Sequence, residues 1–384
     1  MKIGIVCYPT FGGSGVVATE LGKALAQKGH QIHFITYSQP VRLDFFNANI
    51  YYHEVYIPSY PLFQHAPYEL ALTSKIVDVA TNIHLDLLHV HYAIPHASAG
   101  ILARQILATK GIALPVITTL HGTDITLVGK DPSFEPVVTY SINLSDGVTT
   151  VSESLKRDTY AHFEVTQEIE VIPNFIDLTK FRRQKKEHFK KAICPNDEKL
   201  LIHTSNFRKV KRIEDIIAVF AEVRKQIPAK LLLIGDGPER PKIEQLCRDL
   251  EISRCVHFLG KLDAVEEVLS VADVFLMPSE TESFGLAALE AMACEVPVIS
   301  SNAGGLPELN VQGVTGFLSN VGDVKDMVEK TLWVLKDENL PIFRANALAR
   351  AKEFEISKIV PLYENYYERV LEKINAESSL PKSI

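Results

Sequence analysis

The chain has 384 residues, of which 46% are hydrophobic and 23% are charged, and its formal net charge at pH 7 is −7. This composition is ordinary for a globular protein, and the length predicts two domains. The negative charge argues against a general nucleic-acid-binding protein, because no net basic field attracts a phosphate backbone. Any anionic ligand must therefore be held by local cations.

The cysteines and the apolar runs indicate the cellular location of the protein. None of the cysteines forms a CxxC pair, which favours reduced thiols over a disulfide frame or a zinc site. They are Cys7, Cys194, Cys247, Cys255 and Cys294. The chain enters an apolar strand at residues 2–7 without a signal-peptide pattern, and no apolar run reaches the length of a membrane span. We therefore expect a cytoplasmic protein without stable membrane insertion.

Strands and helices alternate through the first half of the chain. Strands are expected at residues 3–8, 33–37, 87–91, 115–121 and 147–151, with helices near 15–28, 68–82 and 97–110. This alternation predicts a parallel sheet with helices on both faces. Ligands of such sheets bind beyond the carboxyl ends of the strands.

A glycine-rich loop follows the first strand. Gly13-x-Gly15-x-x-Ala18 resembles a dinucleotide fingerprint, but the loop is long and the second strand ends without the acid that would hold an adenosine ribose. The glycines can let backbone N–H groups approach a phosphate, or they can form a tightly packed turn. These residues alone leave both readings open.

Polar side chains also gather at two later strand ends. One strand ends in His89-Val-His91-Tyr92, and another runs through Thr119 into His121-Gly-Thr-Asp. A histidine directly before Gly-Thr-Asp at a strand end favours a functional role. The histidines come from different strands without compact ligand spacing, so we expect no metal site and no cofactor.

The second half of the chain repeats the alternating pattern after a join at residues 173–177. Its strands are expected at residues 199–205, 230–237, 256–260, 274–277 and 296–300. Residues 181–191 are interpreted as a solvated, charged helix near the linker. A long helix at 354–374 precedes a tail that we expect to be frayed. Two such sheets would face each other across a ligand-binding cleft.

A cluster of cations follows the first strand of this second set. Arg208 and Lys211, three residues apart, can both reach a diphosphate, arginine by its fork and lysine as a point charge. Such a cluster on its own is more often a solvated helix start.

The stretch between Glu282 and Glu290 is the strongest candidate for the chemistry. Ser283 is the expected N-cap of a short helix, which would leave the N–H groups of residues 284–286 free for an anion. Glu290 would lie roughly 9 Å along the axis, where a carboxylate can bridge the two hydroxyls of a ribose. The glycines at 304 and 305 would let the backbone approach the same ligand.

The spacing of Glu282 and Glu290 matches the E-x7-E motif, and by it the chain resembles the family 4 retaining glycosyltransferases. The His-Gly-Thr-Asp, Ile-Pro-Asn and Gly-Asp-Gly-Pro segments occur in the family's order, and the resemblance covers essentially the whole chain. It implies the α/β GT-B fold, with two facing Rossmann-like domains, parallel sheets and an interdomain cleft that closes over the donor. The implied segments are an acceptor domain at 1–172, a nucleotide-sugar domain at 173–355, a helix at 356–376 that crosses back, and a tail at 377–384.

The resemblance also implies roles for individual residues. The implied catalytic residues are Glu282, His121, Arg208 and Lys211. The implied donor-binding residues are Gly13, Asn206, Arg208, Lys211, Phe284, Gly285, Leu286 and Glu290. The implied acceptor-binding residues are Ser14, Tyr92, Thr119 and His121. Many members space the diphosphate arginine and lysine five apart, so the partner of Arg208 stays open between Lys209, Lys211 and Arg212.

Residues 9–15 and 205–212 are most similar to those members that transfer GlcNAc from UDP-GlcNAc to the hydroxyl of L-malate with retention, the first step of bacillithiol synthesis. The alternatives are a sugar or lipid acceptor for the same donor class, a UDP-GlcNAc 2-epimerase of the same architecture, and a non-catalytic nucleotide-sugar binder. The sequence leaves open whether the protein is a homo-oligomer.

Overall fold

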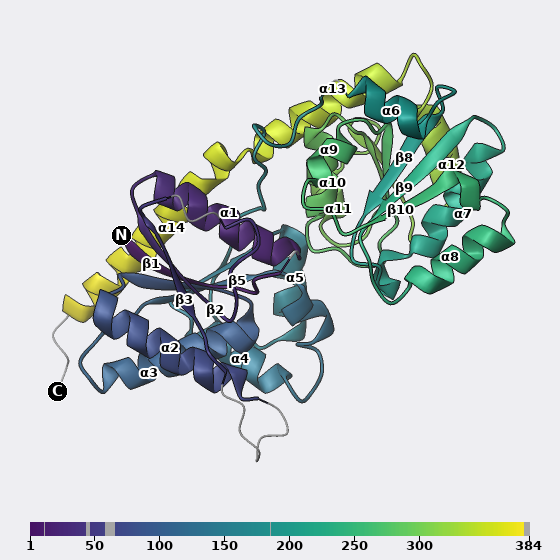
Figure 1. Cartoon of the computed structure of the whole chain (residues 1–384). Coiled ribbons are helices and arrows are strands. Elements are labelled where there is room, and N and C mark those ends of the chain that lie inside the picture. Colours follow the sequence, from purple (N-terminus) through teal and green to yellow (C-terminus); the bar gives the residue numbers. More distant parts are fainter. Residues whose placement is uncertain (11, 44–46, 58–65, 185, 380–384) are drawn as a thin grey trace. The chain divides into compact units, whose positions relative to one another are not determined.

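The structure is a computed structural model that describes residues 1–384 except 11, 44–46, 58–65, 185 and 380–384. The chain forms two compact units (Figure 1). Unit 1 consists of Met1–Pro173 together with Ser357–Ile384, and unit 2 consists of Asn174–Ile356.

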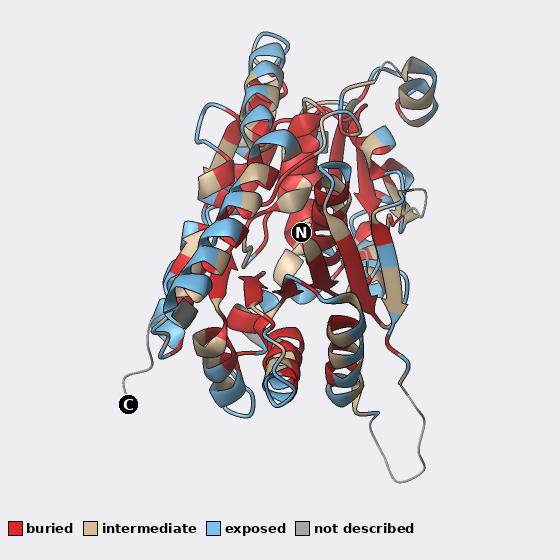
Figure 2. Ribbon diagram, turned by 90° about the vertical axis from the view of Figure 1, so that its left-hand side faces the viewer, coloured by how far each residue is buried: buried red, intermediate tan, exposed pale blue. Residues whose placement is uncertain are grey.

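Unit 1 is built on a seven-stranded sheet whose paired strands are all parallel. The strands, in spatial order, are β3 (Ile50–Glu54), β2 (Gln31–Thr36), β1 (Lys2–Val6), β4 (Leu87–His91), β5 (Val116–Leu120), β6 (Gly147–Thr150) and β7 (Ile169–Val171). The central strands β4, β5 and β6 are buried along their whole length. Burial on both faces explains why they read as nearly continuous apolar runs. Figure 2 shows that buried residues concentrate in the strands, whereas exposed residues lie mainly on the helices.

Helices cover both faces of this sheet. They are α1 (Gly13–Gln27), α2 (Tyr68–Ile83), α3 (Ser98–Ala108), α4 (Glu135–Leu144), α5 (Glu153–His162) and α14 (Ile356–Ser379). The helices α2 and α3 pack through one apolar cluster against the face that carries Leu88 and Val90. On the opposite face lie α1 and α14, and Tyr367 of α14 bonds to His89 there (Figure 1). The predicted frayed tail is wrong at its start, because α14 continues through Ser379; residues 380–384 lie outside the described part.

Unit 2 is built on a second parallel sheet. Its strands, in spatial order, are β10 (Val256–Gly260), β9 (Ala229–Ile234), β8 (Lys199–Thr204), β11 (Val274–Met277), β12 (Val298–Ser301) and β13 (Gly316–Ser319). Its helices are α6 (Glu187–Ile193), α7 (Ile213–Arg224), α8 (Arg240–Asp249), α9 (Val265–Leu269), α10 (Leu286–Ala293), α11 (Leu306–Leu309), α12 (Val324–Val334) and α13 (Leu340–Ala351). One apolar core joins α7, α8 and α12 to the sheet.

Both sheets reverse strand order at a central point, between β1 and β4 in unit 1 and between β8 and β11 in unit 2. In open parallel sheets the crevice for ligands lies at such a switch point, beyond the carboxyl ends of the strands. The loops after these four strands are therefore where the fold places a binding site in each unit.

Three strands were not predicted from the sequence, and one charged segment was interpreted incorrectly. The short strands β3, β7 and β13 were not expected. Residues 181–191 are not simply a solvated face. Lys190 Nζ lies 2.9 Å from Oδ1 of the buried Asp273, which Arg344 also contacts at 2.6 Å.

Candidate active site

In unit 2, the loop between β11 and α10 carries the two glutamates. The helix starts at Leu286, and its N-cap is Gly285 with φ 95° and no side-chain cap hydrogen bond. The prediction that Ser283 caps the helix is wrong, because the left-handed turn at Gly285 moves the helix start two residues along the chain. The N–H groups of Phe284 and Gly285 thus precede the helix, and the open amides of the first turn begin at Leu286.

The backbone of Glu282 is fixed by the glycine pair that follows β12. The N–H of Gly305 donates to the carbonyl of Glu282 at 2.8 Å. A Cβ on Gly304, whose φ is +56°, would lie 1.9 Å from that same carbonyl oxygen. We expected these glycines to let the backbone approach a ligand, but what they approach is the Glu282 loop itself. They hold the first glutamate of the motif in place.

The cations after β8 lie beside this loop. Glu280 N–H donates to the carbonyl of Val210 at 2.8 Å, which ties the two loops together. Lys211 Nζ lies 2.5 Å from Glu282 Oε1, in a pair whose side chains are only 17% and 14% exposed. Arg212 instead bonds Asp215 at 2.6 Å, at the start of α7.

Other predicted donor-site residues of unit 2 differ in exposure. Asn206, Arg208 and Lys209 are exposed. Three residues were candidates for the partner of Arg208. Of these, Lys211 is the one that contacts the motif glutamate Glu282.

Glu290 lies in the middle of α10 and is 9% exposed. It is surrounded in sequence by the buried residues Ala288, Leu289, Ala291 and Met292. A carboxylate in such surroundings requires a polar partner or a ligand. Burial, followed by the charge of Glu290, raises the pKa of the nearby Cys294 thiol to about 12. Neither motif glutamate thus points into bulk solvent.

In unit 1, the start of α1 carries two of the predicted residues. Gly13 is exposed at the first position of the helix, and Ser14 Oγ lies 2.8 Å from Tyr92 Oη at the end of β4. A Cβ on Gly15 would meet the carbonyl oxygen of Tyr8 at 2.3 Å. Of the two readings of this loop, close packing thus applies to Gly15.

The strand ends of β4 and β5 hold a layer of hydrogen-bonded histidines. His91 Nδ1 lies 2.8 Å from His121 Nε2, so the two rings join adjacent strands. Beneath them, Thr119 Oγ1 lies 2.7 Å from both His89 Nε2 and Thr149 Oγ1. Thr119 is fully buried with its hydroxyl engaged in this layer. That position favours a supporting role for Thr119 over direct contact with an acceptor.

Burial keeps this layer uncharged at neutral pH. It lowers the pKa of His89 and of His121 to about 3 and that of His96 to about 4. It also lowers the pKa of His91 well below the usual value, and it raises the pKa of Tyr92 to about 12. The histidines and Tyr92 of the candidate site in unit 1 are therefore neutral hydrogen-bonding groups. Burial raises the pKa of the neighbouring Asp124 to about 6, and its carboxyl accepts hydrogen bonds from the backbone N–H groups of Ala93 and Gly122.

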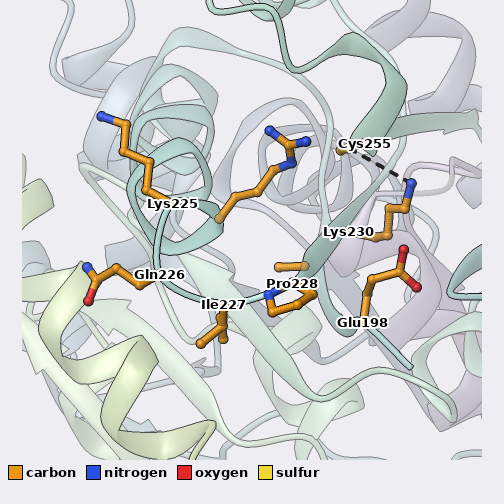
Figure 3. Close-up of a pocket in the computed structure, with 9 residues that line it drawn as sticks. Glu198, Lys225, Gln226, Ile227, Pro228, Lys230 and Cys255 are labelled. Carbon is orange, nitrogen blue, oxygen red and sulfur yellow. Dashed lines mark hydrogen bonds between the residues drawn. The ribbon is translucent and has the colours of Figure 1, made fainter. Parts of the chain in front are cut away.

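A surface hollow of about 510 Å³ lies elsewhere in unit 2. Figure 3 shows Glu198 and Lys230 on one side of it and Lys225 and Gln226 on the other. These residues precede or begin β8 and β9, so the hollow lies at the amino edge of the sheet. The motif residues lie at the carboxyl edge, where the fold places ligands.

Three further observations concern the described part of the chain. All five cysteines are free and buried, as expected for thiols. Among the described residues, no three or more His, Cys, Asp or Glu side chains are grouped so that they could hold a metal ion. None of the helices in those ranges combines the length and the apolar character needed to cross a membrane.

Comparisons with known proteins agree with this geometry. Residues 11–180 match the family described as Glycosyltransferase Family 4, and residues 184–353 match the family described as Glycosyl transferases group 1. The chain is 48% identical over 377 residues to N-acetyl-alpha-D-glucosaminyl L-malate synthase of Bacillus anthracis, covering 97% of each protein. The chain belongs to the family 4 glycosyltransferases. Another relative is alpha-monoglucosyldiacylglycerol synthase of Streptococcus pneumoniae, 30% identical over 81% of this glycosyltransferase and 72% of that protein.

Solved structures share the fold of this family 4 enzyme. HepE of Anabaena in complex with UDP and glucose has a TM-score of 0.79 at 20% identity, covering 99% of this chain and 100% of that one. Sucrose-phosphate synthase from Thermosynechococcus elongatus has a TM-score of 0.79 at 21% identity, covering 97% and 100%. The predicted α/β GT-B fold, with two Rossmann-like domains, is confirmed.

Several residues of the buried layer were not among the predicted site residues, and His91 and Tyr367 illustrate why. His91 was quoted as part of a strand end but given no role, and Tyr367 lies in the C-terminal helix, far away in sequence. His91 could have been found from strand pairing, because His91 of β4 lies opposite Thr119 of β5 and Thr119 is two residues before His121. A sequence without known strand pairing does not reveal that register.

Proposed function

We propose that this glycosyltransferase moves GlcNAc from UDP-GlcNAc to the hydroxyl of L-malate, with retention as the α-glycoside and release of UDP. The reaction would be the first step of bacillithiol synthesis. The observation that carries the proposal is the 48% identity to a protein named for this synthesis, over 97% of both chains. The two halves of the chemistry then map onto the two units.

Unit 2 would hold the donor. Arg208 and Lys211 supply positive charge for the diphosphate, and the start of α10 adds backbone N–H groups. Glu290 would take the ribose hydroxyls, and Glu282 those of the transferred sugar. Lys211 is already bonded to Glu282. Because an ammonium has three N–H donors, Lys211 can keep this bond while it contacts a phosphate.

Transfer would follow a front-face route. The bond from the sugar C1 to the phosphate oxygen breaks, and a bond from C1 to the malate hydroxyl oxygen forms on the same face. The malate proton passes to the departing phosphate oxygen, so neither a protein nucleophile nor a metal is required. Stabilisation of the charge that develops on the diphosphate by Arg208 and Lys211 would then be the main catalytic contribution.

Unit 1 would receive the acceptor. The hydroxyls of Ser14 and Tyr92 and the ring of His121 are neutral hydrogen-bonding groups at one edge of its sheet. The helix α1 has fifteen residues, begins without a side-chain cap and carries no acid in its first turn. Such a helix start favours an anion. A malate carboxylate can be held there without a basic side chain.

Coupled detection of UDP release tests the assignment. With UDP-GlcNAc and L-malate, we expect release that EDTA does not reduce, with α configuration of the product by NMR. D-malate, succinate, glucose and diacylglycerol serve as the comparison panel, and Glu282→Gln is the control for contaminating activity. Release with another acceptor but not with L-malate would retain the family and reject malate. Interconversion of the donor without UDP release would indicate an epimerase.

A further inference from the structure

Two histidine pairs occur in unit 1 with the same atoms in contact, and each joins one buried ring, His91 or His33, to a partly buried one. His91 Nδ1 lies 2.8 Å from His121 Nε2, and His33 Nδ1 lies 3.0 Å from His53 Nε2. In both pairs, Nε2 of the inner ring, His91 or His33, is buried with no hydrogen-bond partner among the described residues. The first pair belongs to the candidate active site, and the second lies between β2 and the edge strand β3.

The surroundings of His91 fix its position. His96 Nδ1 lies 2.5 Å from the carbonyl oxygen of His91, so His96 must donate there and thereby anchors the backbone. The His91 ring packs between those of His89 and His121, with centroids 4.4 and 5.1 Å away. His91 is fully buried, so solvent does not compete with His121 for its ring.

The orphan nitrogen decides which ring donates. A neutral imidazole carries one N–H, so either His91 Nδ1–H donates to His121 Nε2, or His121 Nε2–H donates to His91 Nδ1. The second arrangement would leave His91 with a buried, unpaired N–H. Orphaned buried donors are rarer than under-satisfied acceptors. The first arrangement leaves only an unused lone pair on His91 and is favoured.

We propose that His91 is a positioning residue that fixes His121 as its Nδ1–H tautomer, so that His121 donates a hydrogen bond to the substrate and does not take a proton from it. Nε2 of His121 is occupied by His91, and Nδ1 is the nitrogen left to face a ligand. This inference deepens the proposed function and rests on it for the identity of the substrate. It agrees with a route in which the departing phosphate accepts the malate proton.

The tautomer itself can be measured without any substrate. Long-range proton–nitrogen correlation spectra of the full chain, labelled with ¹⁵N-histidine, distinguish protonated from bare ring nitrogens, and His121→Gln assigns the signals of His121. We expect a protonated Nδ1 and a bare Nε2 at pH 7. A protonated Nε2, or an imidazolium, would overturn the proposal. The tautomer measurement tests the proposal whether or not malate is the acceptor.

Substitutions of His91 test the consequence for catalysis. Asn and Asp are nearly equal in size, but Asn can donate to His121 Nε2 whereas Asp only accepts and forces the opposite tautomer. We expect kcat of His91→Asp to fall about tenfold or more below that of His91→Asn, the size of one lost hydrogen bond. KM for UDP-GlcNAc should stay within about twofold, because unit 2 holds the donor.

The pair His33→Asn and His33→Asp is the matched control. It makes the same changes in a pair with the same contact, away from the proposed active site, so kcat should not distinguish its two members. Equal kcat values for His91→Asn and His91→Asp would contradict the role of His91. If the Asp variant does not fold, the tautomer measurement on the unmodified chain still decides.

Discussion

The carboxyl edges of the two sheets have the same topology but opposite electrostatic character. The edge of unit 1 presents histidines, a tyrosine and a serine that are neutral at pH 7. Its buried acid, Asp124, has a pKa raised by burial to about 6 and accepts hydrogen bonds from the backbone N–H groups of Ala93 and Gly122. The edge of unit 2 presents Lys211 paired with Glu282, the exposed Arg208 and the buried Glu290. One strand order thus supports two kinds of recognition, and the loops after the strands determine which.

The difference follows from what each edge would bind. A leaving diphosphate gains charge during transfer, so fixed cations beside it lower the barrier. An acceptor hydroxyl must be oriented but not charged, and neutral donors do this without drawing its proton away. The cations therefore belong to the edge of unit 2, and the neutral histidines and hydroxyls to the edge of unit 1.

Acid should weaken unit 1 more than unit 2, because burial lowers the pKa of His89, His91, His96 and His121 in unit 1, against His203 in β8 of unit 2. The pKa of His89, His96 and His121 is about 3 to 4 when folded, against about 6.5 when unfolded. The unfolded chain therefore binds more protons in this window, and stability falls as pH falls below 6.5. From pH 7 to 5 the loss is roughly 1–2 kcal/mol for each histidine. Hydrogen exchange, corrected for intrinsic rates, should show protection lost in β4 and β5 before β8 and β11. Earlier loss in unit 2 would contradict a neutral, buried layer.

Removal of the paired cation should have the next largest effect. We expect Lys211→Met to lower kcat by about 100- to 1,000-fold, because it removes charge stabilisation from the leaving group. Steady-state kinetics with UDP-GlcNAc measure this loss. Lys209→Met removes an exposed neighbouring charge and should cost far less. A greater loss for Lys209→Met would assign the diphosphate to Lys209.

Loss of the buried carboxylate should act on donor binding. Glu290→Gln is expected to weaken UDP binding by about 10- to 100-fold in Kd, since hydrogen bonds to a charged group contribute roughly 1.5–3 kcal/mol. Calorimetric titration with UDP measures the affinity directly. Glu280→Gln, an exposed carboxylate of the same loop, is the matched control. Unchanged affinity of Glu290→Gln would remove that residue from the ribose site.

The smallest effect is expected at the amino edge of unit 2. Lys225→Ala alters the lining of the hollow in Figure 3 without touching a motif residue. We expect kcat/KM to change by less than about twofold, because ligands of this fold bind at the other edge. A loss comparable to that of Lys211→Met would mean that the working edge has been misassigned.

The sequence predicted the parts of the fold that depend on periodic apolar runs. The strands at residues 87–91, 256–260 and 274–277 were placed at their observed ends. The edge strands β3 and β13 were missed because they are short and only partly buried, so they lack a continuous apolar run. The pattern of residue types also does not predict a helix end that depends on one backbone angle, such as the left-handed turn at Gly285.

The candidate site was recovered in the same uneven way. Glu282 and Glu290 were found because their spacing is a property of the chain alone. The bond between Lys211 and Glu282 could not be derived, since it joins loops 71 residues apart. The contact between His91 and His121 depends on the register of β4 against β5. Contacts between strands can be predicted only once the fold, and with it the strand pairing, is known.

A crystal structure with UDP and L-malate bound tests the central claim most directly. We expect the diphosphate at Arg208 and Lys211, the ribose hydroxyls on Glu290, and malate against Ser14, Tyr92 and His121. A nucleotide bound away from the loop that carries Glu282 and Glu290, or malate held by charged residues of unit 2 alone, would contradict it.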